Sequence, residues 1–596
     1  MREDLYLDET HFDAVVVGTG VTEALVSGSL SRAGRKVLNL DPTSYYGSQF
    51  ASLTLMDMAK FATTTNKNQI DEIELSKQPL QDDETNIKVE HNMPYTIYES
   101  TKMNLEDINI ETKRRYNRYC LDLHSKFIFC YGDLVKLFLD SDTARMMDFQ
   151  GVVALLQYVS KEDGFVKVPC SKGEIFKHAF ISLNERRLLM KFMKYCLDGN
   201  IDKEKEEGKY DNFSHFLDKK FPIKKLKRTV LKEFILYAIA FLQSEEDAKK
   251  LSAKEGIHLI MRYIQSLGKH GTTSSFLYPL YGISEIPQSF VRVGAVCNAI
   301  HILERGIKNI YSKVEENRIT GIETTPVRQK LTTNHLIINE ETIPKSDDIV
   351  DEESKMKSIV RAIYVVDKPL FDVKQYTKIT DPRQVQNLQN GIIVGFVPPY
   401  TFSENQHYVI TITQMDHTAK VCPKGEYVIT FQMACRSEND HVVLKTAITS
   451  LLNKSSNNEK VPQKTIEKEE QIKEGENQEK VEFEQETTEE KTEDDTTETI
   501  QKKDIQEKQR NIIYHIIYSK KIRKESSLKG SNIYLVPGVS PYIYVDDCIE
   551  KARKIFHSIC PNELFLEKFP NPDEDLIYDE TAKALGVDKD EEENNK

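Results

Sequence analysis

The stretch that most constrains the fold is residues 12–47, which read as strand, glycine turn, helix, strand and acidic residue. Residues 14–17 form a short apolar, β-branched run, typical of a strand buried on both faces of a parallel sheet. Gly18 and Gly20 follow at once, and the second strand ends in Asp41. This order predicts a dinucleotide-binding βαβ unit in which the acid would meet a ribose hydroxyl.

One position departs from that fingerprint. The pattern is G-x-G-x-x-G/A, and Glu23 stands where the third small residue belongs. A Glu side chain does not fit the gap in which helix and strand pack closely, and its carboxylate competes with a pyrophosphate for the N–H groups at the helix start. We therefore expect a Rossmann-type scaffold with a vestigial glycine turn (Gly18, Gly20, Glu23 and Asp41) and no cofactor. A working flavin enzyme with an unusual third position is the alternative.

Length and composition indicate a soluble chain of two or three domains. The chain has 596 residues, of which 39% are hydrophobic, and it contains no apolar run long enough to span a bilayer. Residues 1–11 are acidic and polar, unlike a signal peptide. Nine scattered cysteines without a C-x-x-C pair favour reduced thiols in a cytosolic protein and show no metal-like cluster.

The formal net charge of −13 is unevenly distributed. Residues 454–510 carry 18 acids and 11 bases, and residues 571–596 carry 10 acids and 3 bases, so each segment contributes −7. The rest is close to neutral, which disfavours nucleic-acid binding because that needs a basic face. Residues 453–510 have almost no apolar side chains and are expected to be disordered, and residues 580–596 to form an acidic flexible tail.

Residues 129–272 are rich in apolar side chains at helical spacing and poor in glycine, which predicts an all-helical domain. Two S-x-x-E capping boxes, at Ser171 and Ser182, predict helices near 172–180 and 183–197. Further helices are expected at 227–242 and 248–267.

The chain on either side, 1–128 and 273–596, is predicted to form one discontinuous α/β domain. We expect its strands at 307–312, 318–322, 336–338, 359–366, 391–397, 407–415 and 425–435, then in the segments IIYHIIYSK and SNIYLVP, with a helix at 546–559. Alternation in the stronger strands suits an antiparallel sheet.

Four stretches together resemble one protein family. FDAVVVGTGVTEALVSGSL…VLNLDPTSYYG and FLYPLYGISEIPQSFVRVGAV resemble two signature regions of the Rab GDP dissociation inhibitor and Rab escort protein superfamily. VPCSKGEIFKHAFISLNERRLLMKF and ICPNELFLEKFPNPDEDLIYD are similar to its escort branch. The resemblance implies a large flavoprotein-like (FAD-binding-like, Rossmann-type) domain interrupted by a smaller helical domain.

The resemblance also implies a function that is not redox chemistry. Escort proteins are non-enzymatic accessory subunits (component A) of Rab geranylgeranyltransferase. They bind new GDP-bound Rab GTPases, present them to the α/β heterodimer of the transferase through its α subunit, and carry the product and its geranylgeranyl lipid to membranes. The implied localisation is the cytosol, with transient membrane contact. A Rab GDP dissociation inhibitor, which recycles prenylated Rabs, is the nearest alternative, and a flavin-dependent oxidoreductase is an alternative of another class.

The family's Rab-binding platform maps by motif onto Tyr46, Glu285 and Arg292, with His301 in place of a platform Tyr. A Tyr, a carboxylate and a guanidinium can form charge-assisted bonds with a partner. The structural alternative is that Glu285 and Arg292 only pair with each other. Because His301 replaces a Tyr, the contact that this Tyr would make with a Rab is in doubt. An imidazole can still pack against a partner and donate a hydrogen bond.

Transferase docking in the escort branch uses a Phe and an Arg that align with Phe176 and Arg187. Because Ser182 can cap a helix between them, we expect the two on successive helices. Arg186 is the neighbouring candidate if the register differs by one, and burial of Phe176 in the core is the structural alternative. An exposed aromatic beside an Arg is a common composition of interface hot spots.

Overall fold

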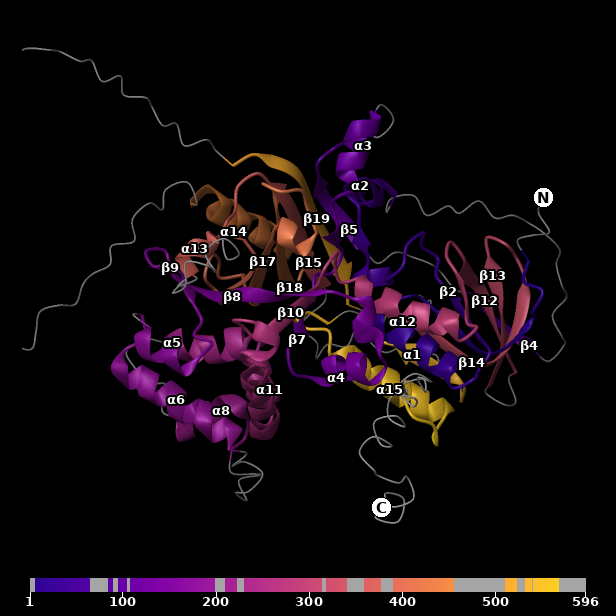
Figure 1. The fold of residues 1–596 in the computed structure, drawn as a ribbon, viewed down its shortest axis with the longest axis horizontal. Helices are drawn as coiled ribbons and strands as arrows, with labels where there is room; N and C mark the ends of the chain where they lie inside the picture. The colour runs from indigo at the N-terminus through magenta and orange to yellow at the C-terminus, as the bar shows by residue number, and fades with distance from the viewer. Residues whose placement is uncertain are drawn as a thin grey trace, which may run out of the picture.

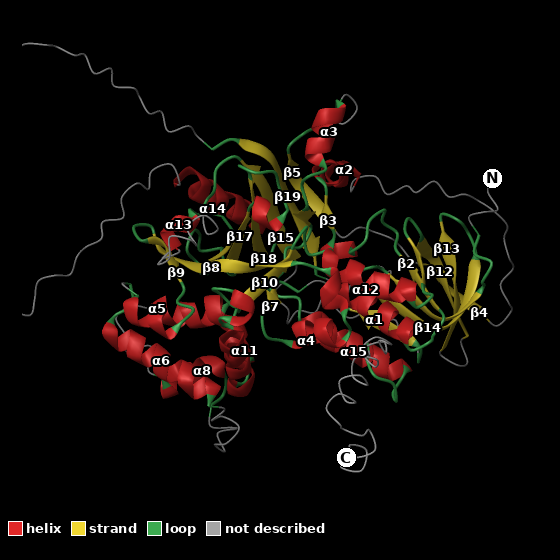
Figure 2. Cartoon of the chain, viewed as in Figure 1, coloured by secondary structure: helices red, strands yellow, loops and turns green. Residues whose placement is uncertain are grey.

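The structure is a computed structural model that describes residues 6–64, 84–88, 95–103, 108–178, 180–198, 210–221, 230–313, 318–339, 358–376, 390–454, 510–522, 531–538 and 540–566. Two large sheets organise it: an eight-stranded sheet at one end and a ten-stranded sheet in the middle, with a group of helices below the second (Figures 1 and 2).

The eight-stranded sheet contains the βαβ unit. Its strands, in spatial order, are β11 (Ile300–Ile302), β2 (Val37–Leu40), β1 (His11–Val17), β14 (Lys330–Asn339), β13 (Arg318–Thr325), β12 (Gly306–Lys313) and β4 (Glu84–Lys88), with β20 (Ile533–Val536) beside β14. β1 runs parallel to both β2 and β14, whereas β12, β13 and β14 form an antiparallel meander. The predicted strand, helix and strand of residues 12–47 are therefore confirmed.

Helix α1 (Val21–Arg32) is buried along almost its whole length. It packs against α12 (Glu285–Val296) and α15 (Asp547–Ile559), segments that are far apart in the sequence (Figure 1). Val21, Leu25 and Phe290 belong to the shared apolar core. Helix α1 is thus enclosed by helices from the middle and from the C-terminal part of the described chain.

The ten-stranded sheet is mostly antiparallel. Its strands are β5 (Tyr95–Ser100), β19 (Ile512–Lys521), β15 (Ser358–Val366), β18 (Tyr427–Cys435), β17 (Ile410–Met415), β16 (Ile392–Val397), β8 (Phe149–Ser160), β10 (Phe276–Pro279) and β7 (Ile128–Phe129), with β9 (Gly164–Lys167) beside β8. β16, β17 and β18 are antiparallel neighbours, as their alternating patterns predict.

The prediction that residues 129–272 are all helical is wrong for β8 and β9. β8 pairs in parallel with β16 and antiparallel with β10, so it is an interior strand of the central sheet. Its residues Val152–Leu156 are buried. A continuous apolar run of this kind suits a buried strand as well as a buried helix, so periodicity could not separate the two. The two-domain division itself stays a prediction.

The range also holds the helices between β9 and β10, which are α5 (Lys172–Lys177), α6 (Leu183–Leu197), α8 (Phe213–Lys220), α9 (Val230–Glu233), α10 (Glu245–Lys250) and α11 (Ala253–Ser266). Of these, α5, α6, α8 and α11 lie together below β8 (Figures 1 and 2). The predictions near 172–180, 183–197, 227–242 and 248–267 each fall on helical segments, whereas α8 was not predicted. A π-helical turn at Phe234–Ile239 continues α9, and Ser252 separates α10 from α11 with a capping box of its own. We call α5, α6, α8 and α11 the helical lobe.

The remaining elements are short or lie at the margins. They are β3 (Ser52–Leu53), β6 (Leu121–Asp122), α2 (Leu55–Thr64), α3 (Ile110–Tyr116), α4 (Asp133–Asp140), α13 (Val373–Tyr376), α14 (Asp440–Lys454), and 3₁₀ turns at Ser48–Phe50, Thr143–Met146, Lys269–Gly271 and His417–Ala419. The segment 453–510, apart from its first two residues and its last, and the tail 580–596 lie outside the described residues.

Candidate functional site

The Glu23 side chain folds back over the glycine turn. It is 1% exposed, and its Oε1 accepts a hydrogen bond of 3.1 Å from Asn339 Nδ2. A Cβ added at Gly20 would lie 2.6 Å from Glu23 Oε2, and one added at Gly18 would lie 3.3 Å from Oε1. The carboxylate is thus accommodated by the turn itself, in the space that a bound pyrophosphate would need.

The Asp41 carboxylate is occupied by the chain's own donors. Its Oδ2 accepts from Thr19 N at 2.9 Å, Thr19 Oγ1 at 2.6 Å and Ser48 Oγ at 2.7 Å. Its Oδ1 accepts from Thr43 N at 2.9 Å and Thr43 Oγ1 at 2.7 Å. A carboxylate has about four lone-pair sites, so no capacity remains for a ribose. Together with Glu23, this geometry does not fit a dinucleotide.

Asp122, a residue that the sequence did not single out, fixes the start of α12. Its carboxylate is buried and accepts from Ser52 Oγ at 2.7 Å, Tyr278 OH at 2.6 Å and Ile283 N at 3.1 Å. Ser52 Oγ in turn accepts from Ser284 N at 3.1 Å. Burial raises the pKa of Asp122 against the lowering effect of these bonds. The network ties α12 to the segment that follows the Tyr46 turn.

The available signal for Asp122 was a single carboxylate between two leucines, Leu121 and Leu123. A buried acid needs several donors. The sequence does not say where those donors come from, because Ser52 and Tyr278 are distant along the chain.

Glu285 and Arg292 lie two turns apart on α12 and therefore on one face of that helix. Glu285 is half-buried, and burial raises the pKa of its carboxyl, whereas Arg292 is exposed. Within the described part of the chain, no ion pair joins the two. The structural alternative, in which they only pair with each other, has no support here.

Tyr46 lies in the turn after β2 and packs, half-buried, against the core that α1 and α12 share. The structure therefore places Tyr46 against the core that α12 helps to form, and Glu285 and Arg292 on one face of α12 itself. Their role in binding stays a prediction.

His301 lies in β11, beside Asn39 of β2, and packs beneath the end of α12. A Cβ added at Gly294 would lie 3.0 Å from His301 Nε2. Both ring nitrogens are buried and lack a hydrogen-bond partner among the described residues, and burial lowers the pKa of His301 to about 4. This position suits a packed, neutral imidazole better than a surface contact.

Phe176 and Arg187 lie on successive helices of the helical lobe, α5 and α6, and both are exposed. Phe176 is 60% exposed, which contradicts the alternative that it is a core residue. The cap of α6 is a full capping box of Ser182 and Glu185. At α5 only half of the predicted box forms, because the Glu174 carboxylate binds Cys170 N and Lys167 instead of Ser171 N.

Arg186, unlike Arg187, is bonded to the chain's own backbone. Its guanidinium donates to the backbone carbonyls of Ile181 at 2.8 Å and Phe176 at 2.6 Å, and also to that of His178. These three bonds hold together the loop that connects α5 to α6. Of the two arginines, Arg187 is therefore the one whose guanidinium is exposed to a partner.

The comparisons with known proteins agree with this architecture. The family model described as "GDP dissociation inhibitor" matches residues 7–77 and 88–479, which is most of the chain. The chain belongs to the GDP dissociation inhibitor family.

Relatives within this family carry escort names. "Rab escort protein 1" of Arabidopsis thaliana is 27% identical over 471 residues, covering 75% of this chain and 80% of that protein. "Rab proteins geranylgeranyltransferase component A 2" of Mus musculus is 24% identical over 687 residues, covering 96% and 99%. The crystal structure of a Rab GDI from Plasmodium falciparum, 19% identical, has a TM-score of 0.61 and covers 94% of this chain and all (100%) of that chain. The fold predicted from the sequence is therefore confirmed.

Two features are absent from the described residues. None of the described helices is long and apolar enough to cross a bilayer. The same residues contain no group of three or more His, Cys, Asp or Glu side chains placed to hold a metal ion.

Proposed function

We propose that this chain is a Rab escort protein, a non-enzymatic accessory subunit (component A) of Rab geranylgeranyltransferase. It binds newly made GDP-bound Rab GTPases, presents them to the α/β heterodimer, and delivers the prenylated product to membranes. The observation that carries this proposal is the exposed pair Phe176 and Arg187 on the helical lobe. Support comes from escort-named relatives that align over most of the chain.

The Rab-binding face is proposed at the start of α12. Arg292 is exposed and Glu285 half-buried, so both can reach a partner, and Tyr46 lies in the adjoining turn. A half-buried carboxylate and an exposed guanidinium that are not bonded to each other are free to form charge-assisted bonds across an interface. His301 is proposed to support α12 from below.

The geranylgeranyl lipid needs an apolar cavity, and we assign it to the helical lobe without naming lining residues. Burying its hydrocarbon chain yields about 0.8 kcal/mol per CH₂ group, enough to hold a lipid while the carrier moves between cytosol and membrane. The cytosol is the proposed localisation, with transient membrane contact during delivery.

A Rab GDP dissociation inhibitor is the second candidate, because the matching family carries that name. Such a protein would bind prenylated Rabs through the same platform without binding the transferase. A flavin oxidoreductase is disfavoured by the carboxylates of Glu23 and Asp41. Purified protein is expected to lack flavin absorbance at about 450 nm.

The deciding experiment measures transferase binding and Rab prenylation with purified full-length protein. Phe176→Ala and Arg187→Ala are each expected to weaken transferase binding by tenfold or more, about 1.4 kcal/mol, and to leave binding of unprenylated Rab–GDP unchanged. Val442→Ala removes an exposed apolar side chain on α14 and serves as the matched control.

Full prenylation activity in both variants would contradict the escort assignment. Loss of Rab–GDP binding in the same variants would show instead that the substitutions had disturbed the fold beyond the helical lobe.

A further inference from the structure

A group of exposed cations lies on α3 and on the loop between β17 and β18. Helix α3 contains no buried residue and stands out from the body at the top of Figure 1. Bases fill its last turn, and the loop 416–426 adds two more. We call the five exposed bases of these segments that form no ion pair among the described residues the basic shelf: Lys113, Arg114, Arg118, Lys420 and Lys424.

The two segments of the shelf are bonded to each other. Arg115 and the buried Tyr119 both donate to the carboxylate of Glu426. Cys120 N donates to the Val421 carbonyl at 3.0 Å. The end of α3 and the loop therefore form one surface, in which the Glu426 carboxylate is already engaged.

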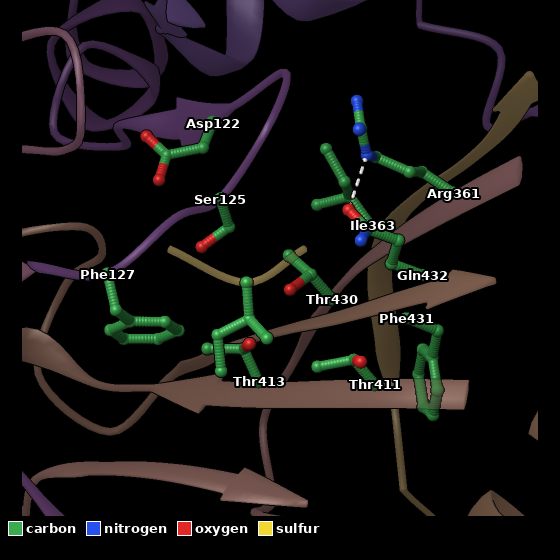
Figure 3. Close-up of a pocket in the computed structure, with 11 residues that line it drawn as sticks. Asp122, Ser125, Phe127, Arg361, Ile363, Thr411, Thr413, Thr430, Phe431 and Gln432 are labelled. Atoms are coloured by element: carbon green, nitrogen blue, oxygen red, sulfur yellow. Dashed lines mark hydrogen bonds between the residues drawn. The ribbon is translucent and has the colours of Figure 1, made fainter. Parts of the chain in front are cut away.

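The chain behind the shelf is anchored in the ten-stranded sheet. Arg361 Nη1 donates to the Leu123 carbonyl at 2.7 Å, and the Tyr518 hydroxyl donates to the same oxygen at 2.6 Å. Figure 3 shows the surroundings, a small pocket between Asp122 and the sheet, where Arg361 also donates to Gln432 Oε1 at 3.0 Å. Because Leu123 follows the shelf closely along the chain, the shelf has a rigid support.

The shelf carries a net positive charge. Residues 108–118 and 416–426 together hold six bases and three acids, a formal net charge of +3. Of the acids, Glu426 is engaged within the shelf, and Asp416 is buried and accepts from two backbone N–H groups. Glu111 lies in the first turn of α3, whereas the bases lie in the last. A partner that approaches the end of α3 therefore meets cations first.

The shelf adjoins the start of α12. Tyr281 N, in the turn before that helix, donates to the Ala419 carbonyl at 3.1 Å. The Cys120 thiol lies near Asp122 and Glu285, whose charges add to the effect of burial in raising its pKa. The basic shelf and the proposed Rab-binding face are therefore parts of one continuous surface.

The contact between these two parts is made by residues in strained backbone. Tyr281 and Lys420 have φ of +71° and +61°, and both are exposed, Tyr281 by 53%. Residues other than glycine persist in this left-handed region only where their surroundings hold them, and they gather at binding sites. A fixed, exposed ring beside a cation is also a common composition of an interface hot spot. The strain and the exposure together indicate a partner at this point.

The three proposed platform residues are too few to hold a folded partner. A stable protein interface buries about 800 Å² on each side and involves about 20–30 residues. A GTPase that sits on Tyr46, Glu285 and Arg292 therefore covers neighbouring surface, and the shelf is contiguous with Glu285. A membrane fits less well, because peripheral binding needs an apolar face and α3, which is described in full, exposes Ile110 as its one large apolar side chain.

We propose that the basic shelf and Tyr281 form a second contact area for the GTPase, complementary to an acidic surface of that protein. The inference rests on the proposed function and adds contacts beyond Tyr46, Glu285 and Arg292. The shelf cations attract the GTPase as it approaches and thereby raise the association rate. The Tyr281 ring is covered in the complex and slows dissociation.

The test measures, by stopped flow, the association and dissociation rates of the purified full-length protein and one unprenylated Rab–GDP at NaCl concentrations from about 0.05 to 0.5 M. The shelf variant carries Lys113→Glu, Arg114→Glu and Lys420→Glu. It is expected to associate about tenfold more slowly at low salt and with a flatter salt dependence, whereas its dissociation rate changes less than about threefold.

The matched control carries Lys191→Glu, Lys249→Glu and Lys250→Glu, which make the same change in net charge at exposed positions on α6 and α10. Its association rate is expected to stay within about twofold of the wild type. A separate variant, Tyr281→Gly, removes the ring and suits the left-handed backbone, so the chain stays folded. It is expected to dissociate about tenfold faster.

Equal association rates for the shelf variant and the control at every salt concentration would overturn this proposal and leave the proposed function intact. Loss of binding to vesicles of phosphatidylserine and phosphatidylcholine in the shelf variant alone, with unchanged Rab–GDP kinetics, would assign the shelf to a membrane and overturn the proposal as well. A wild-type protein that binds no Rab–GDP would contradict the proposed function itself, and this inference with it.

Discussion

Helices α1 and α12 pack against each other and begin in the same way, yet their first turns differ in use. Each follows a glycine with positive φ, +108° at Gly18 and +107° at Gly282, and each carries a glutamate in its first turn. Glu23 is buried and bonded to Asn339. Glu285 is half-buried and, within the described part of the chain, accepts no side-chain hydrogen bond.

The difference comes from what closes each turn. The α1 turn is closed from inside, because Glu23 folds over it. The α12 turn is held from outside by Asp122 and Ser52, which bind its backbone N–H groups. Because Asp122 and Ser52 satisfy these N–H groups, the Glu285 carboxylate remains able to bind a partner. The same local sequence of a glycine with positive φ and a first-turn glutamate thus gives a filled site at α1 and an accessible carboxylate at α12.

The largest expected effect is on stability at the two turns. A Cβ at Gly282 would lie 2.2 Å from Ser52 Oγ at a strained φ, so Gly282→Ala should cost about 3–5 kcal/mol. Gly20→Ala meets only the end of the Glu23 side chain, which can move, and should cost about 1 kcal/mol. Denaturant unfolding followed by circular dichroism measures both. Equal costs would contradict the difference between the turns.

The second prediction concerns the outside closure. Asp122→Asn replaces one acceptor oxygen with an amide donor that faces Ser52 or Tyr278, so we expect a loss of about 2–3 kcal/mol in unfolding free energy. Rab–GDP affinity should fall with it, because α12 loses its anchor. Asp140→Asn, at an exposed position on α4, is the control. Unchanged stability would show that Asp122 does not hold the turn.

The third prediction concerns the open surface itself. Glu285→Gln and Arg292→Ala should each weaken Rab–GDP binding about tenfold, and unfolding midpoints should not change. Because the two side chains form no ion pair among the described residues, their effects on folding stability should add. A strong coupling energy for folding in the double variant would restore the alternative that they only pair with each other.

The smallest expected effect is a pH dependence at His301. Its folded-state pKa is about 4, below the usual unfolded value of about 6.5, so the unfolded chain takes up the proton first. The stability contributed by the neutral ring is complete above the unfolded pKa and declines as pH falls toward the folded one. The midpoint of the wild type should therefore fall more steeply than that of His301→Gln between about pH 7 and 4.5. Parallel curves would contradict this.

Much of the fold follows from local patterns. The strands that became β1, β2, β16, β17 and β18 were predictable because alternation or β-branched runs mark them directly. The capping box at Ser182 predicted the start of α6 correctly, since its two bonds join residues only three apart. Such features depend on neighbours in the chain, which the sequence displays.

The features that were predicted wrongly or missed depend instead on the three-dimensional arrangement of the chain. β8 was predicted as helix because its apolar run does not record which strands flank it. The assignment of Arg186 to the α5–α6 turn, leaving Arg187 exposed, depends on where three backbone carbonyls point. Asp122 stayed unnoticed because its donors are far along the chain.

The sequence by itself determined the βαβ order, the departure at Glu23 and the family motifs, because each is a matter of residue type and spacing. Only the tertiary structure decided that Glu23 fills its own turn, that Asp41 is saturated by Thr19, Thr43 and Ser48, and that Glu285 is left open. The reason is physical. A carboxylate bonds whichever donors folding brings within about 3 Å of it, and those donors come from segments whose separation along the chain carries no information about their distance in space.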